Sequence, residues 1–248
     1  MKSTPPTSNH TKRDDSDASD SVSREEAELF VLNPTGVGRN TLERQAHLYD
    51  AGQSIFIQGH ASLGVYFILE GTVGIRRSDP HGNSTLLRLV ESGQTIGHEA
   101  YFRGSVHNDS ATALTQCRVY FVERSVMDEI KASSPALGEQ FLHRMASDIH
   151  GADGSRVDFI HLQVRARLAQ LLLTLRKHHG TVDDSGNLRI KLPMSRRDMA
   201  SAIGTRPESL SRAIKALQEA GAASFKGKNV IVHDLDDLLD EVETRQKK

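Results

Sequence analysis

Two short helical patterns that meet at a single glycine constrain this chain more than any other feature. They lie in the stretch MSRRDMASAIGTRPESLSRAIKALQEAG, residues 194–221. Ser195 precedes the first pattern and Asp198 follows three residues later, which is the spacing of a capping box with Asp in place of Glu. A helix is therefore expected to begin there, and Gly204 is expected to end it in a tight turn.

The second pattern opens with the same kind of signal. Thr205 and Glu208 have capping-box spacing, and Pro207 fits the first turn of a helix, where its missing N–H costs little. After this helix, the stretch AASFKGKNVIVHD is typical of a β-hairpin that turns at residues 226–228. Two short helices joined by a tight turn and followed by a basic hairpin predict a winged helix-turn-helix.

A helix-turn-helix presents the first residues of its second helix to base edges in the major groove of DNA. Arg212 can bind guanine with two hydrogen bonds, and Glu208 can accept one from the amino group of cytosine. The alternatives are that Glu208 only caps its helix and that Arg212 is a solvated surface charge. The residues expected to read bases are Arg206, Glu208, Ser209, Ser211 and Arg212. The residues expected to contact phosphates are Arg196, Arg197, Thr205, Lys215, Lys226 and Lys228.

The rest of the chain changes its hydrophobic period once. Residues 45–123 contain short runs rich in Val, Ile, Leu, Phe and Tyr between Gly, Asp, Asn and Pro, which predicts a compact antiparallel barrel or sandwich. Residues 135–162 indicate one long helix and residues 162–179 a second. Apolar side chains recur on the long helix in steps of three and four residues. This spacing is typical of a coiled-coil seam between two copies of the chain, and the alternative is a core helix that packs on its own barrel. The expected seam residues are Leu142, Met145, Ile149, Ala152 and Phe159.

Composition excludes several classes of protein. Cys117 is the one cysteine among 248 residues, so neither an intramolecular disulfide nor an iron–sulfur cluster held by about four thiolates can form within one chain. A reducing, cytoplasmic location is expected, because the first residues lack the apolar core of a signal peptide and no apolar run reaches the length of a membrane span. The net charge of −1 means that DNA binding depends on local basic clusters. The common catalytic motifs are absent, so no enzymatic activity is expected.

Several stretches together resemble a known family. GVYFILEGTVGI, SGQTIGHEAYF, VRARLAQLLLTL and GKNVIV, with the helix-turn-helix, resemble in order and spacing the family of the cyclic-AMP receptor protein and the fumarate–nitrate reduction regulator (CRP/FNR) over about residues 28–235. The resemblance implies an α+β chain and a homodimeric transcription regulator, activator or repressor, with double-stranded DNA and RNA polymerase as partners. The expected units are a polar, disordered tail (1–24), an antiparallel, cyclic-nucleotide-binding-like β-roll that senses an effector (25–133), a dimerisation helix (134–161) and a winged helix-turn-helix (162–248).

The second helix of the motif also resembles one branch of this family. Glu208, Ser211 and Arg212 match the Glu-x-x-Ser-Arg pattern of the fumarate–nitrate type. Pro207 stands where cyclic-AMP receptors have the first arginine of their own pattern. The resemblance therefore implies a palindromic DNA site with half-sites related to TTGAT.

The effector site departs from the family pattern. By resemblance, His98 stands where cyclic-AMP receptors have the glutamate that holds the ribose, and Asp109 where they have the arginine that neutralises the cyclic phosphate. Ala152 and Asp153 replace a Thr-Ser pair that contacts adenine. Because a carboxylate repels a phosphate, weak or no binding of cyclic AMP by the usual mode is expected, unless Arg103 substitutes. The expected effector-binding residues are Gly97, His98, Glu99, Ala100, Arg103, Asp109, Ser110, Ala152 and Asp153.

The sequence does not identify the effector. The oxygen sensors of the family use an N-terminal cysteine cluster, which this chain lacks. Haem-based gas or redox sensing is an alternative, because haem needs only a histidine or similar axial ligand and the chain has 12 histidines. No other metal site is expected. An alternative of a different class is a ligand-binding regulatory module that acts through protein–protein contacts. A salt titration separates the two, because affinity for DNA should fall steeply as the salt concentration rises.

Overall fold

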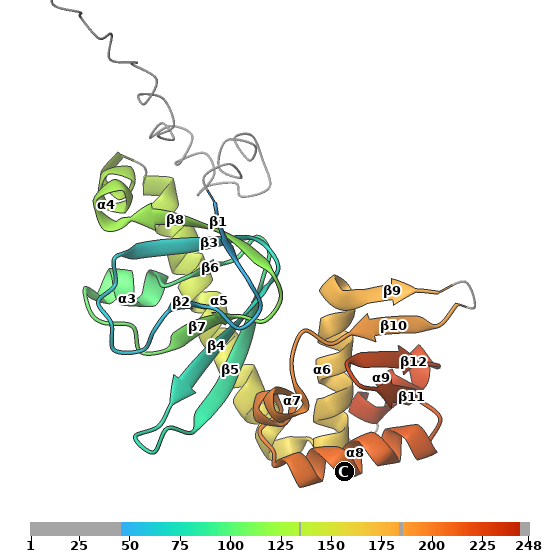
Figure 1. The fold of residues 1–248 in the computed structure, drawn as a ribbon. Coiled ribbons are helices and arrows are strands. Elements are labelled where there is room, and N and C mark those ends of the chain that lie inside the picture. The colour runs from blue at the N-terminus through green and yellow to red at the C-terminus, as the bar shows by residue number, and fades with distance from the viewer. Residues whose placement is uncertain (1–45, 134, 184–185, 244–248) are drawn as a thin grey trace, which may run out of the picture.

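The N-terminal half of the molecule is built from two antiparallel sheets that face each other (Figure 1). A computed structural model describes residues 46–133, 135–183 and 186–243. The strands are β1 (His47–Tyr49), β2 (Ser54–Phe56), β3 (Gly64–Glu70), β4 (Thr72–Ser78), β5 (Ser84–Glu91), β6 (Thr95–Ile96), β7 (Ser110–Ala113) and β8 (Cys117–Glu123). One sheet has the order β1-β8-β3-β6 and the other the order β2-β7-β4-β5. This is the antiparallel roll that the sequence predicts.

The apolar runs of the sequence form the core between these sheets. Six of the seven residues of β3 are buried, and Val73 and Val90 face the same core from paired positions in β4 and β5. Gly71 joins β3 to β4 with φ +88°, and a Cβ there would lie 2.3 Å from the Gln116 carbonyl oxygen. This position therefore requires glycine.

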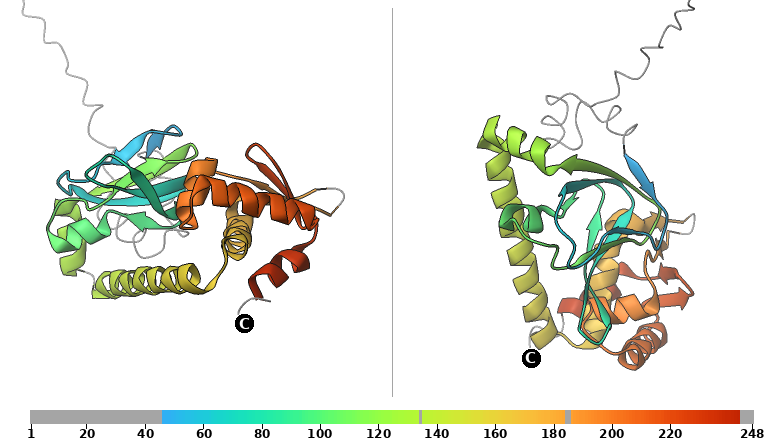
Figure 2. Two further views of the ribbon diagram at one scale, coloured as in Figure 1. Left: turned by 90° about the horizontal axis from the view of Figure 1, so that it is seen from below. Right: turned by 60° about the vertical axis from the view of Figure 1, so that its left-hand side comes forward.

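Helices cover the roll at one end and along one side. They are α3 (His98–Arg103), α4 (Arg124–Ser133) and α5 (Pro135–His161). The predicted long helix is confirmed by α5, which runs along the roll in both views of Figure 2. Phe141 anchors α5 in a core cluster that includes Tyr101 of α3 and Met127 of α4. No pattern in the sequence predicts the short helices α3 and α4.

The C-terminal half is a second compact unit around α6 (Figure 1). Its elements are α6 (Val164–His179), β9 (Gly180–Val182), β10 (Leu188–Lys191), α7 (Arg196–Ala202), α8 (Pro207–Glu219), β11 (Ala223–Lys226), β12 (Asn229–Val232) and α9 (Leu235–Glu243). The sheet has the order β11-β12-β10-β9. Leu168, Leu172 and Leu175 of α6 pack against Leu210 and Leu217 of α8 in its core. The α+β fold class is confirmed.

Two parts of the sequence analysis fall beyond this description. The predicted tail, residues 1–24, and the last five residues, 244–248, lie outside the described residues. Within the described residues, no helix has the length and apolar character needed to cross a membrane.

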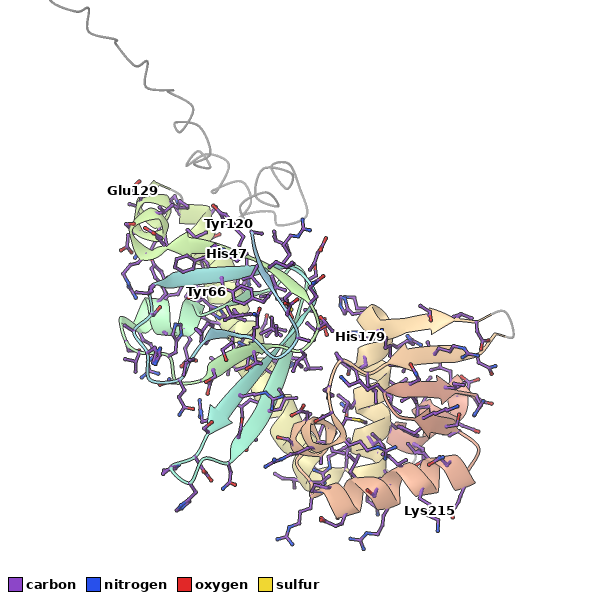
Figure 3. The ribbon with its side chains drawn as sticks, viewed as in Figure 1. His47, Tyr66, Tyr120, Glu129, His179 and Lys215 are labelled. Carbon is purple, nitrogen blue, oxygen red and sulfur yellow. The ribbon has the colours of Figure 1, made fainter. Side chains whose placement is uncertain are left out.

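The two halves meet where the β4–β5 hairpin packs on α7. Leu86 of β5 is only 1 % exposed and belongs to the core of the C-terminal unit. Its backbone N–H donates a hydrogen bond of 2.7 Å to the Ser201 hydroxyl, and Arg76 forms an ion pair of 2.7 Å with Asp198. Farther along β5, Glu91 lies 3.1 Å from the ring of His179, which faces the roll from the end of α6 (Figure 3). The hairpin thus has a defined position relative to α7.

Candidate nucleic-acid interface

The helix α7 begins as the sequence predicts. The Ser195 hydroxyl accepts a hydrogen bond of 3.2 Å from the Asp198 backbone N–H, and the Asp198 carboxylate accepts one of 3.3 Å from the Ser195 backbone N–H. Burial alone would raise the pKa of Asp198, but the hydrogen bonds from Arg76 and Ser195 hold it below its usual value. Met199 and Ala200 are buried, so one face of α7 is fixed in the core.

The turn and the start of α8 differ from the sequence prediction by one residue. Gly204 has φ +61° and forms the predicted tight turn. However, the N-cap of α8 is Arg206 rather than Thr205, and no side-chain hydrogen bond caps the helix. The predicted second capping box is therefore wrong. The reason is Pro207: the residue before a proline favours extended backbone, and Arg206 with φ −86° and ψ 152° is extended as an N-cap must be.

This shift changes the role available to Glu208. Its carboxylate lies in the first turn of α8 and is exposed, without a capping role. A carboxylate at the N-terminus of a helix is stabilised by the helix dipole. Of the two alternatives for Glu208, an accessible hydrogen-bond acceptor at the tip of α8 fits the geometry better than a cap.

The exposed face of α8 carries the other predicted base-reading residues. Arg212 is exposed, and its guanidinium donates a hydrogen bond of 3.3 Å to the Ser209 hydroxyl. The Ser211 hydroxyl donates one of 2.9 Å to the Pro207 carbonyl. Leu210, Ala213, Ile214 and Leu217 lie on the opposite face and are buried. The packing thus directs the polar face outward as one surface.

Basic side chains surround this polar face. Lys215 projects from the outer side of α8 (Figure 3) and lies 3.5 Å from Glu219. Arg196 and Arg197 are exposed at the start of α7. The wing is the β11–β12 hairpin, where Gly227 has φ +62° between the exposed Lys226 and Lys228. The predicted phosphate contacts therefore lie on three elements of one unit, although the net charge of the whole chain is close to neutral.

The roll has its own small cavity, of about 40 Å³, between the sheets and α3. His98 is 3 % exposed; its Nδ1 has no hydrogen-bond partner among the described residues, and its Nε2 lies 3.3 Å from a carboxylate oxygen of Asp148 on α5. His107 stacks on Phe56 with ring centroids 4.0 Å apart, and burial lowers its pKa. The lining residues are Phe56, Ile75, Arg88, Ile96, Gly97, His98, Glu99, Ala100, His107, Asn108 and Asp109.

Five of the predicted effector-binding residues line this cavity, and Arg103 and Ser110 do not. Arg103 pairs instead with Glu99 at 3.2 Å, and the Ser110 hydroxyl accepts a hydrogen bond from the Gln58 backbone. The side chains of Ala152 and Asp153 lie outside the described residues. The sequence analysis did not single out Arg88 or Asn108, which reach the cavity from β5 and the loop before β7. No sequence signal identified these two residues, because only the pairing of the strands brings them to His98.

Comparisons with known proteins agree with both units. A family model described as a Crp-like helix-turn-helix domain matches residues 166–241. A model described as a cyclic nucleotide-binding domain matches residues 46–134, and together the two cover more than half of the chain. The chain belongs to the CRP/FNR family of transcription regulators. The predicted resemblance and the helix-turn-helix are thereby confirmed.

Relatives of this CRP/FNR regulator match over most of their length. The CRP-like cAMP-activated global transcriptional regulator of Mycobacterium tuberculosis is 26% identical over 84% of this chain and 92% of its own. The anaerobic regulatory protein of Haemophilus influenzae is 24% identical over 88% of this chain and 85% of its own. The structure of FixK2 from Bradyrhizobium japonicum has the same fold, with a TM-score of 0.69, 21% identity and coverage of 79% of this chain and 95% of that one.

In this family member the outer face of α5 is apolar and exposed. Leu142 is 66 % exposed and Ile149 is 65 % exposed, and both belong to the predicted seam. Val157 and Ile160 are 54 % and 75 % exposed and extend the apolar face toward the end of α5, which the sequence analysis did not anticipate. The side chains of Ala152 and Phe159 lie outside the described residues.

Cys117 is buried at the start of β8. Its thiol donates a hydrogen bond of 3.3 Å to the Thr72 carbonyl, and burial raises its pKa. A buried thiol with a raised pKa carries little thiolate and is a poor nucleophile.

Proposed function

We propose that this regulator is a homodimer that binds a two-fold-symmetric DNA site and reads each half-site with α8. The observation that carries the proposal is the outward face of α8, where Glu208, Ser211 and Arg212 are exposed above a buried apolar face. Basic side chains of α7 and of the wing flank it, which suits contacts to phosphates on either side of the bases.

The half-site that we propose is related to TTGAT. This follows from the match of Glu208, Ser211 and Arg212 to the fumarate–nitrate pattern. Two half-sites read by one dimer lie about 10 base pairs or a multiple apart, so that both reading helices meet the same side of the duplex. A palindromic duplex with that spacing is the natural probe.

Binding of wild type and Arg212→Ala to this palindrome and to a scrambled duplex tests the proposal. We expect wild type to prefer the palindrome, and binding of both duplexes to weaken steeply with salt as phosphate contacts are lost. Arg212→Ala should cost roughly 1–3 kcal/mol on the palindrome and little on the scrambled duplex, because the arginine would lose a bidentate contact with a base. Fluorescence anisotropy at several salt concentrations measures both.

A matched control separates base reading from general charge. Lys177 is an exposed cation at the far end of α6, so Lys177→Ala should leave both affinities unchanged. An equal loss on the two duplexes for Arg212→Ala would contradict a base-reading role. If wild type bound neither duplex at any salt concentration, a module that acts on another protein would be favoured instead.

The second copy in our proposal packs on the apolar face of α5. Leu142, Ile149 and Ile160 are each more than half exposed on this helix. Large exposed apolar side chains that recur along one helix favour pairing with an equivalent helix. The pairing would also set the distance between the two α8 helices. We also propose RNA polymerase as a partner, through which the DNA-bound dimer would regulate transcription.

For the input, we propose that the roll does not take cyclic AMP in the usual mode. Asp109 occupies the position expected for the phosphate-binding arginine and is paired with Arg77 at 2.7 Å. The cavity beside it, about 40 Å³, is far below the roughly 300–1,000 Å³ of typical ligand pockets. The same size argues against haem inside the roll in this conformation. An absorption spectrum and a mass measurement on the purified protein would identify a haem or a retained nucleotide.

A further inference from the structure

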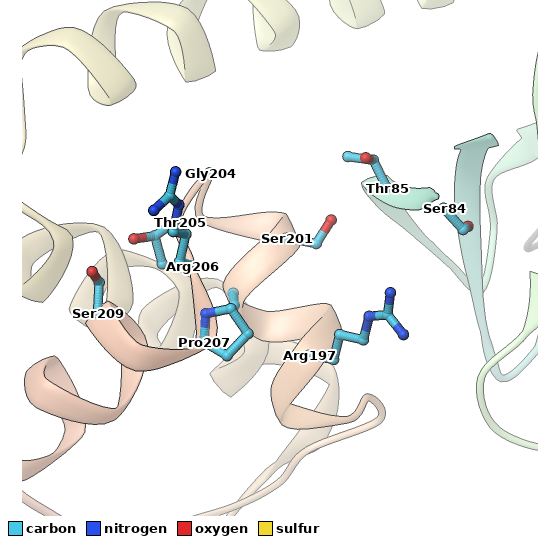
Figure 4. Close-up of a pocket in the computed structure, with 10 residues that line it drawn as sticks. Ser84, Thr85, Arg197, Ser201, Gly204, Thr205, Arg206, Pro207 and Ser209 are labelled. Atoms are coloured by element: carbon cyan, nitrogen blue, oxygen red, sulfur yellow. The ribbon is translucent and has the colours of Figure 1, made fainter. Parts of the chain in front are cut away.

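A second cleft lies between the two halves, beside the helix-turn-helix. Its volume is about 560 Å³. Figure 4 shows Ser84 and Thr85 of the β4–β5 hairpin on one side, and Arg197 of α7 with the start of α8 on the other. Ser201, Thr205 and Ser209 complete the polar part of its lining. Only the hairpin comes from the sensor domain, and the sequence analysis gave it no role in binding.

The chemistry of the cleft suits a phosphate. Hydroxyl groups reach it from both halves, and Arg197 and Arg206 add two guanidinium groups. None of its lining residues has a carboxylate, and neither arginine is in an ion pair with another residue that the structure describes. Guanidinium and hydroxyl donors are the groups that proteins use to hold sugar–phosphate strands.

The hairpin is fixed in this position by contacts just outside the cleft. Leu86 follows Thr85 directly and is buried in the core of the C-terminal unit. The Leu86–Ser201 hydrogen bond and the Arg76–Asp198 ion pair, both 2.7 Å, hold the two strands of the hairpin against α7. Ser84 and Thr85 themselves stay exposed. The hairpin thus presents two free hydroxyl groups from a rigid support.

The cleft also lies where a DNA strand would pass. In a helix-turn-helix complex the first helix crosses the sugar–phosphate backbone while the start of the second enters the major groove. These two elements, α7 and the start of α8, form one wall of the cleft. A strand that leaves the groove beside α7 therefore runs past Ser84 and Thr85 at the start of β5.

We propose that the start of β5, in the β4–β5 hairpin, is part of the DNA-binding surface. Ser84 and Thr85, together with Arg197 and Arg206, hold one sugar–phosphate strand in the cleft. The inference rests on the proposed function, because it requires DNA on α8. It adds a contact from the sensor domain that contributes affinity and no sequence preference, since phosphates are the same at every base pair.

Thr85→Glu tests this inference by placing a negative charge in the cleft. We expect it to weaken binding of the palindrome and of the scrambled duplex by the same factor, about threefold to tenfold at moderate salt, which is the scale of one lost phosphate contact. Arg197→Ala should do the same and lower the slope of log affinity against log salt by about one contact. Ser84→Ala with Thr85→Ala should act in the same direction with a smaller loss.

Thr181→Glu is the matched control, because Thr181 is an exposed strand threonine on β9, at the opposite end of the C-terminal unit from α8 (Figure 1). It should bind both duplexes as wild type does. Thermal melting of each variant checks that the hairpin remains folded. The Ser84→Ala/Thr85→Ala double variant, which adds no charge, covers the case in which Thr85→Glu melts early.

Three results would overturn the inference, and they differ from failure of the proposed function. Unchanged affinity and salt slope in Thr85→Glu and Arg197→Ala, with wild type still binding the palindrome, would remove the hairpin from the DNA surface. A loss of affinity confined to the palindrome would show that the contact recognises the base sequence and not the phosphates. Binding of pyrophosphate that depends on Thr85, with DNA binding unaffected, would assign the cleft to a small free anion. If wild type binds no duplex at all, the proposed function itself fails.

Discussion

At the scale of single residues, charge decides what the roll can hold. Asp109 accepts a hydrogen bond from the Arg77 guanidinium at 2.7 Å, which raises the pKa of that arginine. Arg88, which lines the cavity, lies 3.5 Å from Asp148 of α5. The guanidinium groups of Arg77 and Arg88 are therefore already matched by carboxylates, and that of Arg103 pairs with Glu99. An anionic ligand would have to displace one of these carboxylates before it gained a partner.

This pairing predicts the outcome of a titration with cyclic AMP. Wild type should give no saturable heat in calorimetry at micromolar ligand. Asp109→Asn should raise the affinity by about tenfold or more, because it removes a repelling charge and releases Arg77. Asp79→Asn, which changes an exposed turn carboxylate, is the control and should have no effect. Micromolar binding by wild type would show that the nucleotide is held in another way.

At the scale of elements, the sequence predicts long periodic segments well and short ones poorly. The helices α5 and α6 carry enough repeats of a 3.6-residue pattern to be located within two residues, and the short helix α7 is located by its capping box and Gly204. In contrast, α3 has six residues and β7 has four, too few for any period to stand out. The capping-box spacing of Thr205 and Glu208 places the second cap one residue too early. The residue before Pro207 favours extended backbone, and this preference makes Arg206 the N-cap.

The confirmed cap of α7 gives a prediction for this element. Ser195→Ala should destabilise the C-terminal unit by about 1 kcal/mol, because the Asp198 backbone N–H loses its acceptor. That corresponds to a shift of roughly 2–4 °C in the melting temperature for a chain of this size. Differential scanning calorimetry measures it. Ser211→Ala is the control: its hydroxyl only bonds the Pro207 carbonyl within α8, and it should melt as wild type does or slightly later.

At the scale of the whole molecule, the arrangement of the two halves depends on contacts that no local pattern announces. Leu86 lies in a strand of mixed polar and apolar residues, yet its side chain is part of the core of the other unit. Glu91 and His179 are 88 residues apart and meet at 3.1 Å. Sequence reasoning could therefore identify the roll, the long helix and the winged helix separately. It could not place the hairpin against α7, and so it missed the cleft between them.

The face of α5 yields the prediction that belongs to this scale. Ile149→Glu would place two carboxylates opposite each other in a paired seam, so we expect dimerisation to weaken by at least about tenfold, or 1.4 kcal/mol. Sedimentation velocity at micromolar concentration should then show monomer, and affinity for the palindrome should fall because each copy binds one half-site alone. Ser147→Glu, two residues earlier and on another face of the helix, should remain dimeric. A wild-type protein that sediments as a monomer at every concentration would contradict the seam. An Ile149→Glu variant that stays dimeric would move the interface to a different face of the molecule.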